Sequence, residues 1–434
     1  MTVITADDVE GAGAELRLGK GDILTPLARD RAGELGVKIR YDASDRSTSA
    51  ALSGPTIPET NAGRRSGPPA GPAASAQRSA GNASAAPTQL GAFSGALYRR
   101  GAPLPGSMHP RPETDNARAD QRNAADGRPR AAVIGAGHVG ATTTLRLVET
   151  SLFSTVTMID IVPGLAEGLA LDMWHSAGLR GFTSRVHGSD ELTALRDCDY
   201  IVMTAGRPRK PGMTRTDLTD VNAKIIESVA DKIREYAPNA VVVVVTNPLE
   251  EMTELMTRRT GFPPERVIGM AGVLDSARFC SLVALTGIAD PGEVEALALG
   301  SHGPEMVIPL SLATARGKPL VDQLPANELE AIVERARNSG AEVVGLLKEG
   351  SAYYSPAESA ATMVRAMVTG DNSVMAACAR SKGAYGLADT RVGLPVRLGR
   401  HGLAEIVELP LRADERAALE EAAKRIAERV DALG

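Results

Sequence analysis

Three glycines in the segment GAGHVG are spaced to bind a phosphate group. Gly135, Gly137 and Gly140 follow a short apolar run at 130–134 and lead into a stretch of helical character. In that context the first glycine permits a tight turn and the second lets the backbone approach a pyrophosphate. The third lets the helix pack close to the strand. The phosphate would then lie at a helix N-terminus, where unpaired N–H groups favour an anion.

A carboxylate completes this dinucleotide signal. The next apolar run, TVTMID, ends in Asp160, which lies 20 residues after Gly140. There a carboxylate can accept hydrogen bonds from ribose hydroxyls, and it repels a 2′-phosphate. The motif therefore predicts a site for NAD rather than NADP, with His138 and Val139, between the glycines, as further contacts.

Candidate groups for proton transfer and anion binding lie elsewhere in the chain. His302 in GSHGPEM has an unperturbed pKa of about 6.5 and could exchange a proton near neutrality. Arg209 and Arg215 lie in the polar loop RPRKPGMTRTD, and a guanidinium fork matches the two oxygens of a carboxylate. Taken alone, however, His302 is more often a loop histidine with a satisfied hydrogen bond, and the loop could be basic without a ligand.

Five motifs connect these residues to a known family. The segments GAGHVG, TAGRPRKPGMTRTDL, VTNPLEEMT, GVLDSARF and GSHGPEM occur in the order and approximate spacing of the lactate/malate dehydrogenase family, which the chain resembles from about Pro129 to Leu433. GSAYYSPAES and YGLADTRVGLPVRLG make it most similar to the bacterial malate dehydrogenases that are built like lactate dehydrogenases. The resemblance implies an NAD-dependent oxidoreductase of the tricarboxylic acid cycle that interconverts (S)-malate and oxaloacetate by hydride transfer.

The resemblance also implies a role for each candidate. His302 corresponds to the family's base, and Asp275 to the carboxylate that orients and stabilises its imidazolium. Arg278 corresponds to the arginine that grips the C1 carboxylate of the substrate. Arg215 corresponds to the residue that polarises the reacting carbonyl. No metal ligand is implied.

Arg209 carries the expectation about the substrate. Lactate dehydrogenases typically have glutamine at this place, so the resemblance implies that Arg209 receives a second carboxylate beneath a mobile lid. Pyruvate would leave that charge unpaired, which can cost on the order of 10⁴ in selectivity. Malate is therefore favoured, and L-lactate or another 2-hydroxy acid is the alternative.

Further cofactor contacts follow from the same resemblance. Asn222 corresponds to a contact with NAD. Val245, Thr246 and Asn247 belong to the VTNP segment at the end of a Val-rich run, and Asn247 is expected to touch both substrate and nicotinamide. From the residues alone, TNP could simply terminate a strand.

The histidine motif departs from the family pattern at two positions. Ser301 stands where the family usually has glycine, and Pro304 where it usually has an acidic residue. Proline fixes φ and removes an N–H, so the loop is expected to sit differently, with Glu305 as the candidate replacement for the lost acid. Arg207 adds charge beside the lid. Every proton-transfer group is retained, but an altered dicarboxylic substrate stays open.

The elements that position these groups alternate along the chain. Runs such as CDYIVMTAG and AVVVVVTNP are almost continuously apolar, as parallel strands covered on both faces require, and a helical stretch at about 222–236 lies between them. The pattern predicts an α/β fold in which residues 129–272 form a doubly wound, parallel Rossmann sheet that binds NAD. Residues 273–434 are expected to form an α+β catalytic domain.

The first 128 residues have a different character. Residues 1–41 predict a small α/β head made of a helix, a short strand, a helix opened by Thr25 and Pro26, and a strand ending near Tyr41. Residues 42–128, rich in Gly, Ala, Ser, Pro and Arg, predict a disordered, low-complexity linker. ILTPLARDRAGELGVKI resembles the N-terminal segment of ethanolamine-utilisation accessory proteins of bacterial microcompartments. We interpret the head as a docking module that tethers an NAD-recycling enzyme to a scaffold or microcompartment.

Composition excludes several classes of protein. The net charge of −5 over 434 residues gives no electrostatic footprint for nucleic acid, and no uncharged apolar run reaches the length of a membrane span. The cysteines Cys198, Cys280 and Cys378 are widely spaced without a CxxC pair, which argues against a disulfide framework or a zinc site and favours the cytoplasm. The family resemblance further implies a homodimer or homotetramer.

Overall fold

The computed structural model describes residues 3–4, 9, 13, 15–18, 23–24, 31–32, 35–41, 127–207, 215–348 and 350–433. The chain divides into two units, Met1–Tyr98 and Arg99–Gly434, which we describe separately. Most of the predicted linker, residues 42–126, lies outside the described residues. So do Thr25, Pro26 and Arg209. For Arg215 the structure describes the backbone but not the side chain.

The described part of the head contains two pairs of short parallel strands. β2 (Glu15–Leu18) pairs with β4 (Lys38–Tyr41), so the expected strand does end at Tyr41. β1 (Val3–Ile4) pairs with β3 (Ile23–Leu24). The sequence did not predict β1 and β3, because two-residue strands are too short to show an alternating pattern.

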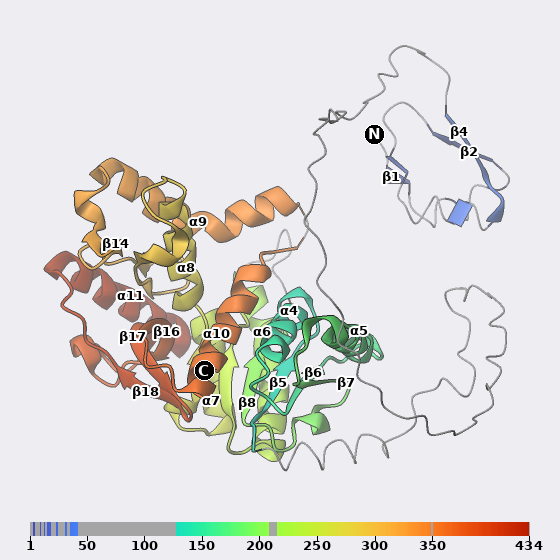
Figure 1. Ribbon diagram of the computed structural model, residues 1–434, viewed down its shortest axis with the longest axis horizontal. Helices are drawn as coiled ribbons and strands as arrows, with labels where there is room; N and C mark the ends of the chain where they lie inside the picture. The colour runs from blue at the N-terminus through green and yellow to red at the C-terminus, as the bar shows by residue number, and fades with distance from the viewer. Residues whose placement is uncertain are drawn as a thin grey trace, which may run out of the picture. The chain divides into compact units, whose positions relative to one another are not determined.

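The second unit is built on an eleven-stranded sheet whose first half is parallel (Figure 1). Its six parallel strands lie in the order β7-β6-β5-β8-β9-β10, which is the strand order of a dinucleotide-binding doubly wound fold. The strands are β5 (Arg130–Ile134), β6 (Thr155–Ile159), β7 (Arg185–Ser189), β8 (Tyr200–Met203), β9 (Val241–Val244) and β10 (Val267–Gly269). The predicted Rossmann sheet is therefore confirmed.

The second half of the sheet is antiparallel and continues from β10. β16 pairs with β10, β17 pairs with β16, and a hairpin formed by β12 and β13 follows at the edge. A separate three-stranded sheet has the order β11-β14-β15. These strands are β11 (Val294–Glu295), β12 (Leu299–Gly300), β13 (Met306–Val307), β14 (Thr314–Ala315), β15 (Lys318–Pro319), β16 (Met375–Arg380), β17 (Arg391–Gly399) and β18 (Gly402–Ile406). This mixed region gives the α+β character expected of the C-terminal part.

Helices cover both faces of the sheet. The long helices are α4 (His138–Glu149), α5 (Leu165–Arg180), α6 (Arg215–Tyr236), α7 (Leu249–Thr260), α8 (Gly272–Ala284), α9 (Ala326–Leu347), α10 (Tyr354–Thr369) and α11 (Ala413–Asp431). Single 3₁₀ turns lie at η2 (Leu192–Leu195), η3 (Pro264–Arg266), η4 (Pro291–Glu293), η5 (Leu320–Asp322) and η6 (Ala384–Gly386). α6 starts earlier than the predicted stretch at 222–236, since Asp217 in its first turn favours the positive end of the helix dipole.

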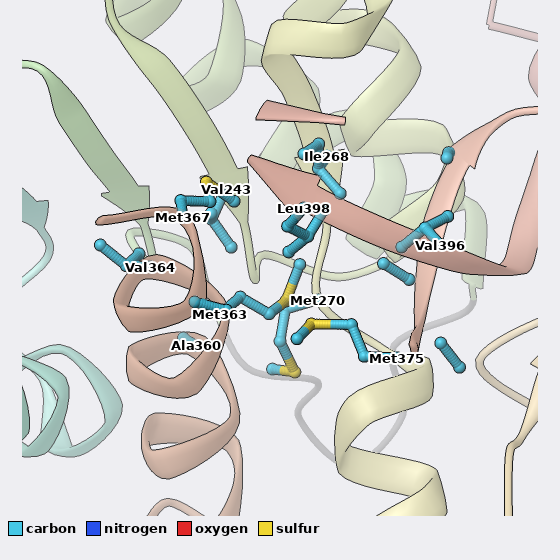
Figure 2. Packing of buried hydrophobic residues seen from close by; sticks show 14 of the residues in the cluster. Val243, Ile268, Met270, Ala360, Met363, Val364, Met367, Met375, Val396 and Leu398 are labelled. Atoms are coloured by element: carbon cyan, nitrogen blue, oxygen red, sulfur yellow. The ribbon is translucent and has the colours of Figure 1, made fainter. Parts of the chain in front are cut away.

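The run of valines in β9 explains why this strand lacks polar alternation. Val241 and Val243 pack into a core shared with α4 and α10, whereas Val242 and Val244 pack into a second core with α6 and α7. Figure 2 shows Met363 of α10 in the first of these cores. Both faces of the strand are therefore buried, as the sequence pattern requires.

Among the described residues, no helix is both long and apolar enough to cross a membrane. The described part of the chain also holds no group of three or more His, Cys, Asp or Glu side chains that could bind a metal ion. All three cysteines are free. Burial raises the pKa of the Cys198 thiol to about 12 and that of Cys280 to about 11, so these thiols are poor nucleophiles at neutral pH.

Candidate active site

The glycine turn lies where the strand order reverses, between β5 and β8. Gly135 has φ +100°, and a Cβ atom there would stand 2.8 Å from the Thr204 hydroxyl. A Cβ at Gly140 would overlap the carbonyl of Gly135. Both positions therefore require glycine, for the turn and for the close approach of α4 to the strand.

The start of α4 has the features of an anion site. Gly137 is the N-cap residue and is exposed, no side chain caps it, and no acidic residue occupies the first turn. The N–H groups of this turn are thus available to a negatively charged group. His138 is exposed beside them with its ring centroid 5.0 Å from that of Tyr353, and Val139 is half-buried. These residues fit the pyrophosphate of a dinucleotide.

Asp160 connects the end of β6 to the glycine turn. Its Oδ2 accepts a hydrogen bond of 2.7 Å from the N–H of Ala136, and its Oδ1 accepts one of 3.0 Å from the N–H of Val162. The carboxylate is therefore held at the turn while it keeps lone pairs for ribose hydroxyls.

Asn222 holds two loops together. Its Oδ1 accepts from the N–H of Arg207 at 2.8 Å, and its Nδ2 donates to the carbonyls of Arg207 at 3.2 Å and Asn247 at 2.7 Å. Since both amide hydrogens are used and the side chain is buried, Asn222 positions the backbone on either side. Thr246 does the same through a 2.7 Å hydrogen bond to the Ala205 carbonyl.

The two residues on either side of Thr246, Val245 and Asn247, are less buried than Thr246. Asn247 is exposed and Val245 is half-buried. The VTNP segment therefore presents Asn247 at the end of β9, next to a backbone that Asn222 and Thr246 hold in place.

His302 and Asp275 are in direct contact. His302 Nδ1 lies 2.7 Å from Asp275 Oδ2, and Nη1 of Arg278 donates to Asp275 Oδ1 at 3.1 Å. Asp275 lies in the first turn of α8 and is buried, Arg278 follows one turn later, and His302 lies between β12 and β13. Because the ionised carboxylate can only accept, Nδ1 carries the proton in this pair and Nε2 is left for chemistry.

The surroundings of His302 raise its pKa. Burial disfavours the charged imidazolium, but the charge and hydrogen bond of Asp275 outweigh it, with a further contribution from Glu250 and an opposing one from Arg278. The pKa of His302 therefore lies above its ordinary value of 6.5, because the protein stabilises the imidazolium form.

Glu250 is a site residue that the sequence did not predict. It lies in the first turn of α7, is buried, and accepts the backbone N–H of His302 at 2.6 Å through Oε1. Burial raises its pKa, while the hydrogen bond from His302 opposes that rise. Glu250 lies three residues after Asn247 in the sequence and bonds the backbone of His302. It therefore links the VTNP segment to the histidine loop.

Two hydrogen bonds within the histidine loop hold it together, and one of them involves Ser301. Ser301 Oγ donates to Glu305 Oε2 at 2.8 Å, and the N–H of Met306 donates to the Gly303 carbonyl at 3.1 Å. Burial opposes ionisation of Glu305, yet the Ser301 hydroxyl and nearby arginines bring its pKa below the usual value. Glu305 therefore supplies a carboxylate to the loop in which Pro304 replaces the usual acid.

Several of the predicted residues are linked to one another by hydrogen bonds or by adjacency in the sequence. A chain of hydrogen bonds and sequence neighbours runs from Asn222 through Asn247 and Glu250 to His302 and Asp275. Arg215 is the first residue of α6 rather than part of a loop, and Arg209 lies outside the described residues.

Comparisons with known proteins agree with this geometry. The NAD binding domain of the lactate/malate dehydrogenases matches residues 129–269. The alpha/beta C-terminal domain of the same family matches residues 272–433. The cofactor of the domain that carries the glycine turn is thus NAD.

Curated relatives match along nearly their whole length. The malate dehydrogenase of Chloroherpeton thalassium is 45% identical over 296 residues, which are 68% of this chain and 96% of that protein. The malate dehydrogenase of Synechocystis sp. is 43% identical over 300 residues, 69% of this chain and 92% of the relative.

Solved structures show the same similarity. Malate dehydrogenase from Cryptosporidium parvum has a TM-score of 0.68 at 37% identity, covering 70% of this chain and 99% of that one. Lactate dehydrogenase from Cryptosporidium parvum, complexed with lactic acid and nicotinamide adenine dinucleotide, has a TM-score of 0.68 at 33% identity, covering 70% and 98%. With two family domains in sequence and relatives matched over nearly their full length, this chain belongs to the lactate/malate dehydrogenase family.

Proposed function

We propose that this chain interconverts (S)-malate and oxaloacetate with NAD, and that His302 exchanges the proton. The observation that carries the assignment of roles is the 2.7 Å contact between His302 Nδ1 and Asp275 Oδ2. Relatives named malate dehydrogenase, at 45% and 43% identity, support the substrate.

His302 works through Nε2, since Nδ1 faces Asp275. In malate oxidation, Nε2 accepts the proton of the C2 hydroxyl, and Asp275 stabilises the imidazolium that forms. In the reverse direction the imidazolium returns this proton to the carbonyl oxygen. NAD, when bound at the glycine turn, supplies the acceptor for the hydride that leaves C2.

The arginines bind and polarise the dicarboxylic acid. Arg278 contacts Asp275, and we assign it to binding the C1 carboxylate beside the base. We assign Arg215 to polarising the carbonyl, Arg209 to the second carboxylate, and Asn247 to a contact with both substrate and nicotinamide. For Asn222 and Thr246 we propose that they support NAD binding by holding the loops rather than by donating to the cofactor.

A paired assay tests this proposal. NADH oxidation is followed by absorbance with oxaloacetate and with pyruvate, for the wild type and for Arg209→Gln. We expect a strong preference for oxaloacetate that the variant reduces. A wild-type preference for pyruvate would overturn the role of Arg209 and favour lactate or another 2-hydroxy acid.

We further infer a homo-oligomer, a homodimer or homotetramer, from the surface of α5. Leu171 of this helix is 56% exposed and Leu179 is 91% exposed, and Ala166 and Ala170 are its buried residues. Apolar side chains so exposed favour burial against a second copy of the chain. Light scattering should give a mass above that of one chain, and Leu179→Glu should lower it. A monomeric wild type would contradict the inference.

For the head we propose a docking role, with a cytoplasmic enzyme tethered to a scaffold or placed in a bacterial microcompartment. The two family domains match residues 129–269 and 272–433, and the malate dehydrogenase of Chloroherpeton thalassium is matched over 96% of its length. We infer that residues 129–433 correspond to a whole enzyme of the family. Deleting residues 1–128 should leave the kinetic constants unchanged and abolish co-sedimentation with a cellular assembly. Lost activity would instead give the head a structural role.

A further inference from the structure

The hairpin that carries His302 is fastened by its own side chains. The strands β12 and β13 pair at Leu299↔Val307 and Gly300↔Met306, which leaves residues 301–305 as the tip. Within the tip, the Ser301 hydroxyl donates to the Glu305 carboxylate at 2.8 Å. Because Ser301 stands where the family usually has glycine, this hydrogen bond depends on a residue at which the chain departs from the family pattern.

Glu305 also connects the hairpin to α11 through ion pairs with two arginines of that helix. Oε1 of Glu305 lies 3.7 Å from Nη1 of Arg429 and 3.8 Å from Nη1 of Arg425. The side chains of Glu305 and Arg429 are 18% and 21% exposed, so water screens this ion pair less than it screens a surface pair. The helix also packs close to the base of the hairpin, because a Cβ at Gly300 would stand 3.2 Å from Cβ of Ala422.

Arg429 of α11 also forms an ion pair with a residue of α7. Its Nε lies 3.3 Å from Oε1 of Glu251, a carboxylate buried in that helix. The residue before Glu251 is Glu250, which accepts the N–H of His302. Two paths therefore connect α7 to the histidine, one direct and one through Arg429, Glu305 and Ser301.

We propose that Glu305 and Arg429 are positioning residues that hold the histidine loop, through Ser301, where Nδ1 of His302 meets Asp275. We assign neither residue a contact with the substrate, and the inference rests on the proposed role of His302. The C-terminal helix α11 thereby becomes part of the support of the active site.

Substitution of Arg429 distinguishes two ways in which this residue could affect His302: through its charge, or by holding the histidine loop in position. The charged groups facing His302 are Asp275 and Arg278 from α8 and Glu250 from α7, with Glu305 on its own hairpin. Removing the cation of Arg429 would, by Coulomb's law alone, raise the pKa of His302. Loosening the loop would weaken the contact with Asp275 and lower that pKa toward about 6.5. The two explanations predict opposite signs.

The experiment measures the pKa of His302 by NMR titration of the full chain, with the signal assigned from His302→Asn. We compare Arg429→Gln with a matched control, Glu420→Gln, an exposed residue of α11 that bonds Arg416. We expect Arg429→Gln to lower the pKa and to reduce kcat by about 10- to 100-fold, with an unchanged KM for NAD. The control should change none of these.

A pKa in Arg429→Gln that rises or stays constant would overturn the proposal, whatever happens to kcat. If Arg429→Gln does not fold, Ser301→Ala is the second variant, because it removes only the hydroxyl that joins the loop to Glu305. It should shift pKa and kcat in the same directions, and unchanged values there would also overturn the proposal. Since NMR needs no turnover, failure of the malate assay in the wild type is a separate result.

Discussion

Asp275 engages His302 with one carboxylate oxygen and Arg278 with the other, at 2.7 and 3.1 Å. The same buried group therefore orients the proposed base and the proposed carboxylate-binding arginine. A change at Asp275 should affect proton transfer and substrate binding together.

Asp275→Asn tests this coupling. The amide can still occupy the space, but it no longer stabilises an imidazolium and can favour the wrong tautomer, so we expect kcat to fall on the order of 10³-fold. The KM for malate should rise, because Arg278 loses an ion-pair partner. Steady-state kinetics with Asp389→Asn as control, an exposed carboxylate bonded to Arg380, measures both effects. A KM that stays constant would contradict the shared role.

The raised pKa of His302 predicts opposite pH dependences in the two directions. Malate oxidation needs neutral His302, so its kcat/KM should increase as pH rises through the pKa of the folded enzyme, which lies above 6.5. Oxaloacetate reduction needs the imidazolium and should decline over the same interval. Profiles of both reactions check this, and an inflection at or below the ordinary value would contradict the influence of Asp275.

The same shift predicts a pH-dependent contribution to stability. Because the pKa is higher in the folded protein, the contribution to the free energy of unfolding is complete below about 6.5, the unfolded value. It is lost as pH rises through the folded pKa. Urea unfolding across this interval should show the loss, and His302→Asn should remove that part of the dependence. An identical pH dependence in the variant would show that another group is responsible.

Glu250→Gln tests the buried carboxylate beside the histidine loop. Glutamine can still accept the His302 N–H, but the negative charge that raises the pKa of His302 is gone. The malate-oxidation profile should therefore shift to lower pH, with a smaller change in kcat than in Asp275→Asn. Glu358→Gln, an exposed residue paired with Arg146, is the control. An unshifted profile would mean that Glu250 does not act on His302 by its charge.

The elements that could be predicted from the sequence are those marked by a pattern within a short segment of the chain. The parallel strands follow from uninterrupted apolar runs such as β9, and the glycine turn follows from three glycines whose spacing the geometry of Gly135 and Gly140 requires. Asp160 was predicted at a strand end, and it lies directly after β6.

The buried face of α7 could not be predicted in this way. Its acidic residues, among them Glu250 and Glu254, are typical of the first turns of a surface helix. The structure buries them, because partners come from far along the chain: Arg391 of β17 bonds Glu254 at 3.2 Å, and His302 bonds Glu250. Such pairs leave no periodic pattern. The hydrogen bonds of Asn222 could not be predicted either, because its backbone partners, Arg207 and Asn247, are distant from it in sequence.

Asp160→Ser should change which dinucleotide the enzyme prefers. The carboxylate accepts hydrogen bonds from the N–H groups of Ala136 and Val162, so it sits at the glycine turn with its charge fixed. Repulsion between this charge and a 2′-phosphate at about 4 Å amounts to roughly 1–4 kcal/mol, which corresponds to roughly 5- to 1,000-fold in relative affinity. Serine removes the repulsion and one set of ribose hydrogen bonds.

We therefore expect the KM for NAD to rise and the KM for NADP to fall in Asp160→Ser, measured with saturating malate. Asp231→Asn, a half-buried carboxylate bonded to Arg259, controls for the loss of charge alone. If the ratio of the two KM values did not change, the carboxylate would be a support for the turn through Ala136 and not a determinant of cofactor choice. Because the serine hydroxyl can also accept a hydrogen bond, the variant separates these two functions better than alanine would.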